Sequence, residues 1–193
     1  MADVTPSQTV GPYFAYGLTP LERYEWNDAF NNNLVTPDAV GNRIRVEGRV
    51  VDGDGEAIPD AMIEIWQADG QGRFIVPDAD GVKPNTAFRG FGRCPTDSNG
   101  YFAFDTVKPG AIAGPDGKMQ APHLLVAYFS RGLLTHLFTR IYFSDEAANA
   151  SDPILSLVPI ERRDTLIAKK VGDVYRFDFY MQGDKETVFF GIR

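Results

Sequence analysis

Residues 43–66 read RIRVEGRVVDGDGEAIPDAMIEIW, and this stretch decides the fold. Over residues 43–50 charged side chains alternate with small or apolar ones, so one face of the segment is apolar and the other carries charge. The two Asp-Gly pairs of residues 52–55 supply the positive-φ positions of a tight turn. Alternation resumes over residues 61–66. The stretch therefore predicts two β-strands, near 43–51 and 60–67, joined by a turn.

The same pattern recurs along the chain. The sequence Asp97-Ser98-Asn99-Gly100 predicts a second hairpin turn, and residues 101–105 predict the strand that leaves it. A short helix is expected after residue 144, with Ser144 as its N-cap. Further strands are expected at residues 123–131, 134–143, 174–180 and 187–190. Short strands joined by Gly/Asp turns predict an all-β antiparallel β-sandwich with long loops.

Composition bounds the function. The chain has 193 residues, a net charge of −7 and a pI near 4.8, which argues against a general nucleic-acid binder because nothing offsets phosphate repulsion. No apolar run approaches the roughly 18 residues that a membrane helix needs. The N-terminus shows no signal-peptide pattern, and the single cysteine allows no disulfide within the chain. We therefore expect a cytoplasmic protein.

Two regions are expected. Residues 1–42 show little regular pattern and are rich in proline and aromatic residues, which predicts an extended N-terminal arm that packs on something. Residues 43–193 show no linker and predict a single β-sandwich domain. The arm covers either its own sandwich or a partner.

The residues alone identify no complete catalytic centre. The chain has two histidines, His123 and His136, and no CxxC or HExxH pair, so the usual structural zinc sites are excluded. We expect His123 to begin a strand with a local hydrogen bond, and His136 to lie on a strand face. The two could make an iron site only if a carboxylate came near both. Arg131, beside Gly132 between two strands, is either a solvated loop residue or an anion-binding residue.

An ordered set of motifs carries a resemblance. The chain contains TPSQTVGPY (5–13), IEIWQADGQGRF (63–74), GFGRCPTDSNGYFAFDTVKPG (90–110), APHLLVAYFSRGL (121–133), THLFTRIYF (135–143) and ETVFF (186–190). Together they resemble the intradiol ring-cleavage dioxygenases over nearly the whole chain. The resemblance implies an oxidoreductase with a β-sandwich fold and non-haem Fe(III) chemistry.

The iron-ligand positions implied by the resemblance are mostly replaced here. The family's catalytic chains hold Fe(III) through two tyrosines and two histidines. The tyrosine positions correspond to Phe74 and Ile112, and the histidine pair to His123 and Leu125. Only His123 is retained, and hydrocarbon side chains cannot donate a lone pair to Fe(III). We therefore expect no metal in this chain, as in the non-iron alpha-type subunit of the two-subunit members.

The resemblance also implies a partner. An iron-bearing beta subunit would cleave 3,4-dihydroxybenzoate with O2 to 3-carboxy-cis,cis-muconate, and the present chain would be inactive alone. Four arm residues and Arg131 would line the rim of the partner's substrate pocket, where a cation favours a carboxylate substrate. The arm residues are Thr9, Gly11, Pro12 and Tyr13. The alternatives are a stand-alone transthyretin-like binding module and an independent iron enzyme.

Overall fold

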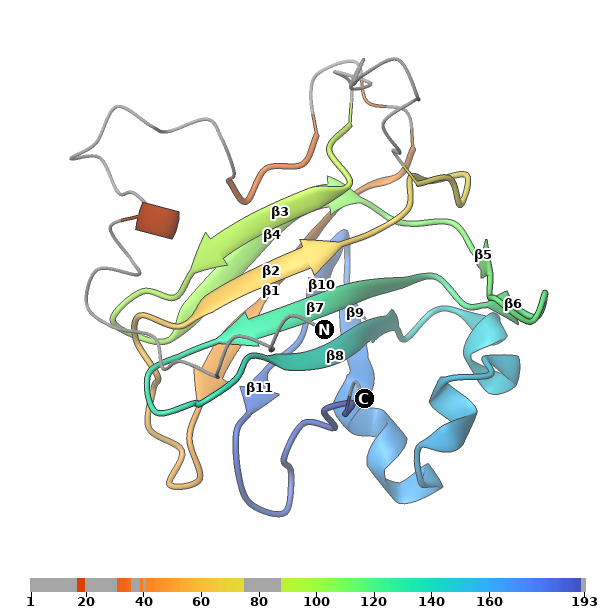
Figure 1. Ribbon diagram of the computed structural model, residues 1–193. Coiled ribbons are helices and arrows are strands. Elements are labelled where there is room, and N and C mark those ends of the chain that lie inside the picture. Colours follow the sequence, from red (N-terminus) through yellow and green to blue (C-terminus); the bar gives the residue numbers. More distant parts are fainter. Residues whose placement is uncertain (1–16, 20–30, 36–38, 40, 75–87, 192–193) are drawn as a thin grey trace, which may run out of the picture.

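The computed structural model describes residues 17–19, 31–35, 39, 41–74 and 88–191. In these ranges the regular structure consists of strands, short 3-10 helices and a helical fragment at residues 17–18 (Figure 1). The strands are β1 (Arg43–Val51), β2 (Met62–Trp66), β3 (Phe91–Pro95), β4 (Tyr101–Val107), β5 (Ile112–Ala113), β6 (Met119–Gln120), β7 (His123–Phe129), β8 (Leu137–Phe143), β9 (Ile167–Val171), β10 (Val174–Arg176) and β11 (Phe179–Tyr180). The helices are η1 (Ala147–Ser151), η2 (Leu155–Leu157) and η3 (Ile160–Leu166).

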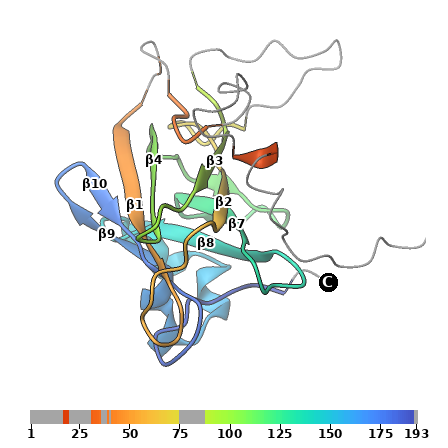
Figure 2. The ribbon, with the colours of Figure 1, turned by 90° about the vertical axis from the view of Figure 1, so that its left-hand side faces the viewer.

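The strands form two layers that face each other (Figure 2). In the first layer β1 lies between β4 and the pair β10 and β11, and in the second layer the order is β8-β7-β2-β3. Strand β9 pairs with both β10 and β8 and so joins the layers. The predicted all-β class is confirmed.

Three strand pairs differ from the uniformly antiparallel pairing expected from the sequence. Strand β1 pairs in parallel with β10 and β11, and β8 pairs in parallel with β9. Parallel neighbours need a long crossover between them. The segment with η1, η2 and η3 supplies that crossover between β8 and β9. The turn residues of the sequence do not reveal this crossover.

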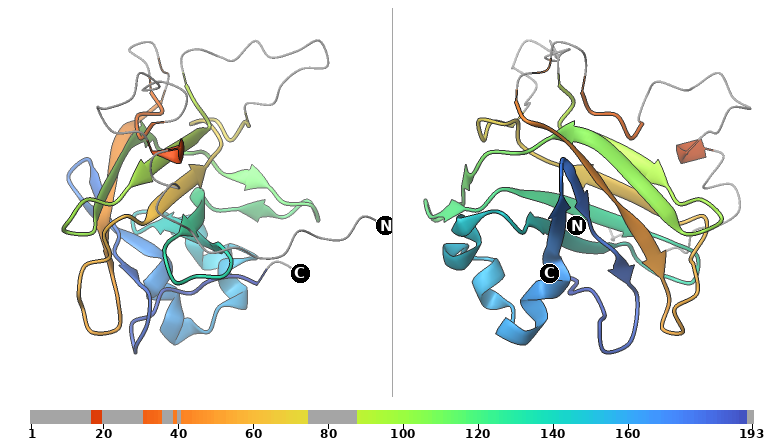
Figure 3. Two further views of the ribbon diagram at one scale, coloured as in Figure 1. Left: turned by 60° about the vertical axis from the view of Figure 1, so that its left-hand side comes forward. Right: turned by 180° about the vertical axis from the view of Figure 1, so that it is seen from behind.

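The main core lies between the two layers. The apolar faces predicted for β1 and β2 point inward, with Val46, Val50, Ile63 and Ile65 all fully buried. A smaller apolar cluster lies between β8 and the 3-10 helices, and it consists of Ala121, Tyr142, Leu155, Val158 and Leu166. Seen from behind, the first layer crosses the second, and the 3-10 helices lie beside one end (Figure 3). Within the described ranges, none of the helices is long and apolar enough to cross a membrane.

The turn predicted at residues 97–100 is confirmed, but it is not a hairpin turn, because β3 pairs with β2 in one layer and β4 pairs with β1 in the other. Oδ1 of Asp97 accepts hydrogen bonds from the backbone N–H groups of Asn99 and Tyr101, at 2.8 and 2.9 Å. Gly100 has a φ of +69°, and a Cβ at this position would lie 2.5 Å from the carbonyl oxygen of Val50. Glycine is required here by the backbone conformation and by the close neighbouring strand.

Three local expectations are corrected. Ser144 is not an N-cap: η1 begins after Glu146, and the Ser144 hydroxyl accepts a hydrogen bond from the Lys170 N–H at 3.0 Å. The strand predicted at 174–180 is interrupted between β10 and β11. There Oδ1 of Asp178, and not a backbone carbonyl, accepts the hydrogen bond from the N–H of Arg49 at 2.9 Å. Residues 187–190 contribute only one isolated bridge, Phe190 to Phe138, and not a strand.

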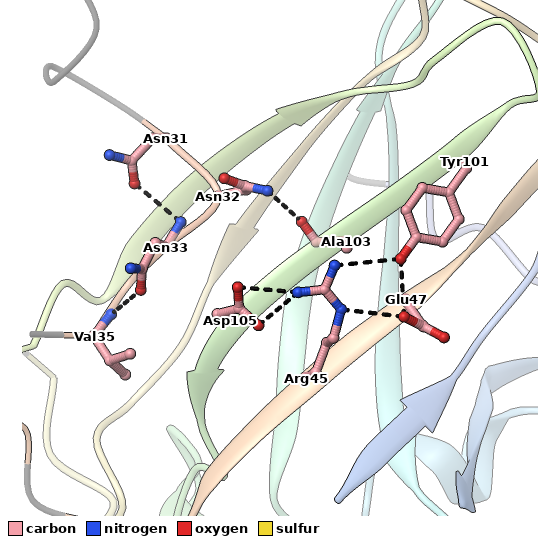
Figure 4. A network of polar contacts seen from close by, with 9 residues as sticks. All are labelled: Asn31, Asn32, Asn33, Val35, Arg45, Glu47, Tyr101, Ala103 and Asp105. Carbon is pink, nitrogen blue, oxygen red and sulfur yellow. Dashed lines mark hydrogen bonds and ion pairs between the residues drawn. The ribbon is translucent and has the colours of Figure 1, made fainter.

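The described end of the N-terminal arm packs on this chain's own sandwich. Residues 31–35 run beside β4, where the Asn32 side chain donates to the carbonyl of Ala103 and the N–H of Leu34 donates to that of Asp105 (Figure 4). Leu34 is fully buried. This segment also accepts a hydrogen bond from the N–H of Arg93 in β3, so it covers the edge between the layers. The interface predicted for the earlier residues of the arm lies outside the described residues.

Candidate functional site: a pocket at the start of β7

A pocket of about 260 Å³ opens on the outer face of the second layer, where β7 begins. All four positions that the resemblance assigns to iron ligands line this pocket, together with polar residues that the sequence analysis did not single out. The four positions are Phe74, Ile112, His123 and Leu125, and the polar side chains are Gln67, Gln120 and Arg140. The fold thus brings residues from five separate segments to one place.

Two loops hold the apolar wall of the pocket. The carboxylate of Asp69 accepts hydrogen bonds from the backbone N–H groups of Gln71 and Arg73, at 2.8 and 2.9 Å, and these fix the turn that precedes Phe74. Gly72 in this turn has a φ of +78°, and a Cβ there would lie 2.2 Å from the carbonyl oxygen of Ala111. The two loops therefore pack backbone to backbone, which places Phe74 and Ile112 on the same wall.

His123 lies at the inner end of the pocket, as the first residue of β7. Its Nδ1 lies 2.7 Å from the carbonyl oxygen of Ala121, and because a carbonyl only accepts, Nδ1 carries the hydrogen. Burial, together with the nearby positive charge of Arg140, lowers the pKa of His123 to about 4. The imidazole is therefore neutral at pH 7, with a lone pair on Nε2. The predicted local hydrogen bond of His123 is confirmed.

A polar network lies beside the imidazole. Nη1 of Arg140 donates to Oε1 of Gln120 at 2.7 Å and to the hydroxyl of Tyr142 at 3.3 Å. That hydroxyl donates to Oδ1 of Asp152 at 3.0 Å. Asp152 is fully buried, and its two oxygens also accept hydrogen bonds from three backbone N–H groups. In the described part of the chain, no carboxylate oxygen lies within 4.0 Å of the Arg140 guanidinium.

These side chains do not suit a ferric ion. Of the four positions that the resemblance assigns to iron ligands, only His123 offers a lone pair, while Phe74, Ile112 and Leu125 offer none. Arg140 adds a positive charge that would repel a cation. Among the described residues, no group of three or more His, Cys, Asp or Glu side chains is placed to hold a metal ion. The described residues of the pocket therefore offer no ligand set for iron.

His123 and His136 lie too far apart to share a metal. His123 pairs with Tyr142 at one end of the β7–β8 ladder, whereas His136 precedes Leu137, which pairs with Tyr128 at the other end. Six residues of extended chain separate the two ends, about 20 Å at the usual rise per residue. His136 stacks on Phe129 just before β8 and not on a strand face. The independent iron enzyme built on both histidines is therefore excluded by geometry.

Arg131 lies at the opposite end of β7 from the pocket. It follows the strand in an exposed loop, and its Nη2 forms an ion pair of 2.7 Å with Oδ2 of Asp60. Its side chain is 65% exposed, so its guanidinium can reach a neighbouring molecule. The predicted arm residues Thr9, Gly11, Pro12 and Tyr13 lie outside the described residues.

The sequence analysis missed Gln120, Arg140 and Asp152. Arg140 could have been noticed as a lone cation between the aromatic residues Phe138 and Tyr142 on one face of a predicted strand. Its contact with Gln120 depends on the pairing of β7 with β8, which no local pattern gives.

Comparison with known proteins agrees with this fold. A family model described as Dioxygenase matches residues 10–183, so the chain belongs to this dioxygenase family. The protocatechuate 3,4-dioxygenase alpha chain of Burkholderia cepacia is 50% identical over 197 residues, which cover 97% of each chain. The beta chain of the same name from Burkholderia cepacia is 32% identical over 188 residues, covering 91% of this chain and 77% of the beta chain.

A solved structure supports the fold. The intradiol ring-cleavage dioxygenase of Tetranychus urticae matches with a TM-score of 0.60 at 18% identity, covering 97% of this chain and 100% of that chain. The all-β fold is thus that of the intradiol dioxygenases. Because identity to the alpha chain exceeds identity to the beta chain, the present chain is of the alpha-chain type, a subunit of an oxidoreductase. These matches speak against the stand-alone transthyretin-like module.

Proposed function

We propose that this chain is the iron-free subunit of a heteromeric intradiol dioxygenase that cleaves 3,4-dihydroxybenzoate. The ring-cleaving ferric site lies in a beta-type partner chain. The observation that carries the proposal is the pocket at the start of β7. This pocket lies where the resemblance places the iron site of the family's catalytic chains, but it presents Phe74, Ile112 and Leu125, with Arg140 beside them. A chain with such a pocket takes part in the reaction only through a second chain.

The outer face of the second layer supports a partner. Around a groove of about 410 Å³ it presents Trp66, Leu125, Phe129, His136 and Phe138, of which Trp66 is 53% exposed. Large aromatic side chains in contact with one another on a surface mark an interaction site. Close by, Glu64 and Arg93 form an ion pair whose side chains are only 14% and 13% exposed, so this part of the face presents little free charge. A beta-type chain is the occupant that we propose for this face.

Arg131 supports a direct contribution to the partner's substrate pocket. It is an exposed cation on the loop after β7, and the ion pair that it forms with the partly exposed Asp60 contributes little stability. The guanidinium can therefore turn to a carboxylate of the substrate, with which it forms paired hydrogen bonds. The arm residues Thr9, Gly11, Pro12 and Tyr13 are proposed to form the neighbouring wall.

The experiment that tests this proposal compares two preparations. The full chain is purified alone and after co-expression with a beta-type chain, and iron content and cleavage of 3,4-dihydroxybenzoate are measured in both. We expect a stable complex with about one iron per pair and full activity, whereas the chain alone binds no stoichiometric iron and cleaves nothing. A beta-type chain alone is the matched control. An active, iron-loaded preparation of the present chain alone would contradict the proposal.

A further inference from the structure

The pocket at the start of β7 contains a positive charge that has no acidic side chain beside it among the described residues. Two contacts of Arg140 are to neutral oxygens, those of Gln120 and Tyr142, and both use Nη1. An arginine has five N–H donors, so most of its donors remain for other partners. Asp152 lies behind Tyr142, and its oxygens already accept hydrogen bonds from that hydroxyl and from backbone N–H groups. The charge of Arg140 therefore faces the pocket, and no described residue supplies a direct counter-charge.

The rest of the pocket is suited to an apolar body. Its walls carry Trp66, Phe74, Ile112 and Leu125. A volume of about 260 Å³ lies just below the range of sites for drug-sized ligands, so it accommodates one small ring. A site with apolar walls and one guanidinium binds a group that is hydrophobic at one end and anionic at the other.

His123 limits the charge and orientation of such a ligand. Because its Nδ1 donates to Ala121, the nitrogen that remains for the pocket is Nε2, which bears a lone pair and has no hydrogen-bond partner within the described ranges. The imidazole is only 9% exposed, so its position in the pocket is fixed. A lone pair repels a carboxylate, so the carboxylate lies at the Arg140 end and the ring faces His123.

The geometry points to a binding site for a small aromatic monocarboxylate in this pocket, with the carboxylate on Arg140 and the ring between Trp66, Phe74 and Ile112. The site lies in this chain alone, so it goes beyond the subunit role proposed above. It requires no metal and no residue of a partner chain. It also accounts for a feature that the loss of iron ligands leaves unexplained, namely a cation on the wall of an apolar pocket.

The test is a calorimetric titration of the full chain at neutral pH with benzoate and with benzamide, which has the same shape but no charge. We expect benzoate to bind at one site per chain, at least tenfold more tightly than benzamide, because a charge-assisted pair with arginine is lost in the amide. The substitution Arg140→Gln should lower benzoate affinity to the level of benzamide. Arg176→Gln, which removes an exposed cation on β10, is the matched control and should change nothing.

A second variant protects the test against a folding failure of Arg140→Gln. Ile112→Trp fills the pocket without changing its charge and should abolish binding of both probes. If the chain is soluble only with a partner chain, the titration is repeated on the complex. The difference in benzoate affinity between the wild-type complex and the Arg140→Gln complex then reports binding in this pocket. Equal affinity for benzoate and benzamide, or unchanged benzoate binding in Arg140→Gln or in Ile112→Trp, would overturn the proposal.

Discussion

The hydroxyl of Tyr142 donates a hydrogen bond of 3.0 Å to Oδ1 of Asp152, and both residues are fully buried. The same carboxylate accepts the N–H of Ala121 at 2.7 Å, just before β7, and the N–H of Leu155 at 2.7 Å, at the start of η2. One side chain thus ties β8, the start of β7 and the crossover helices together. Because Ala121 also receives the hydrogen bond of His123, Asp152 fixes the position of the pocket.

We predict that Asp152→Asn destabilises the protein by about 2–4 kcal/mol, because an amide places a donor against donors in a fully buried site. The free energy of unfolding measured with urea tests this. Asp164→Asn is the matched control, since Asp164 is 89% exposed and its ion pair with Lys169 is long, at 3.9 Å. The control should cost less than about 0.5 kcal/mol. An equal loss of unfolding free energy in the two variants would show that Asp152 does not hold β8, the start of β7 and the crossover helices together.

We predict that His123 makes the stability depend on pH in the acid range. Its pKa in the folded state is about 4 because the ring is buried, whereas an unfolded histidine has a pKa of about 6.5. Between these values the unfolded chain binds a proton that the folded chain does not, so stability falls as the pH falls from 6.5 to 4 and is unaffected above 6.5. From pH 7 to pH 5 the loss from this one group is about 2 kcal/mol.

The measurement is the free energy of unfolding at pH 7 and pH 5 for the wild type and for His123→Gln. The variant should lack this part of the pH dependence, whatever the carboxyl groups contribute to both proteins. His136→Gln, which removes an exposed imidazole at the other end of the ladder, should keep the wild-type dependence. A His123→Gln profile parallel to the wild type would contradict the prediction.

The strands were predictable where the signal is local. Alternation over residues 43–51 and 61–66, and the Asp-Gly and Asn-Gly turns, report the backbone conformation of those same residues, and the structure agrees. The parallel partners of β1 were not predictable, because alternation does not say which strand lies alongside. The break at Asp178 also depends on a contact with Arg49, 129 positions away.

The site was predictable only in part, and for a different reason. Ile112 and His123 line the same pocket, and only the family resemblance could predict this. No period or spacing in the sequence indicates that the two residues lie together. The polar side of the pocket arises from pairing: Arg140 lies opposite Leu125 in the β7–β8 ladder, with Gln120 just before β7. A cation at this place is visible in the sequence only once the register of the ladder is known.

We predict that Arg131→Ala weakens turnover of 3,4-dihydroxybenzoate in the assembled complex and leaves iron content unchanged. The free energy of unfolding should change by less than about 1 kcal/mol, because the ion pair with Asp60 is exposed. Steady-state kinetics and metal analysis on the same preparation test this. Arg176→Ala, which removes another exposed cation, is the control and should keep wild-type kinetics. Unchanged kinetics in Arg131→Ala would remove this residue from the substrate pocket.

The last prediction places donors at three of the four positions that the resemblance assigns to iron ligands, since His123 already offers one. The triple variant Phe74→Tyr, Ile112→Tyr, Leu125→His adds two phenols and an imidazole beside His123, and we expect it to bind about one ferric ion per chain, because oxygen and nitrogen donors then replace hydrocarbon. Adding Arg140→Gln should raise the affinity further, since it removes a cation from the wall of the pocket.

Metal analysis after equilibration with Fe(III) and desalting measures the bound iron, and near-ultraviolet absorption reports whether the new phenols become phenolates. The triple variant with His123→Gln is the matched control and should bind less, because one donor is missing while the charge is the same. Each single substitution should bind no stoichiometric iron, since two donors do not hold the ion. If the folded triple variant binds no more iron than the wild type, the four positions do not converge closely enough to form a metal site, and the pocket is not what remains of one.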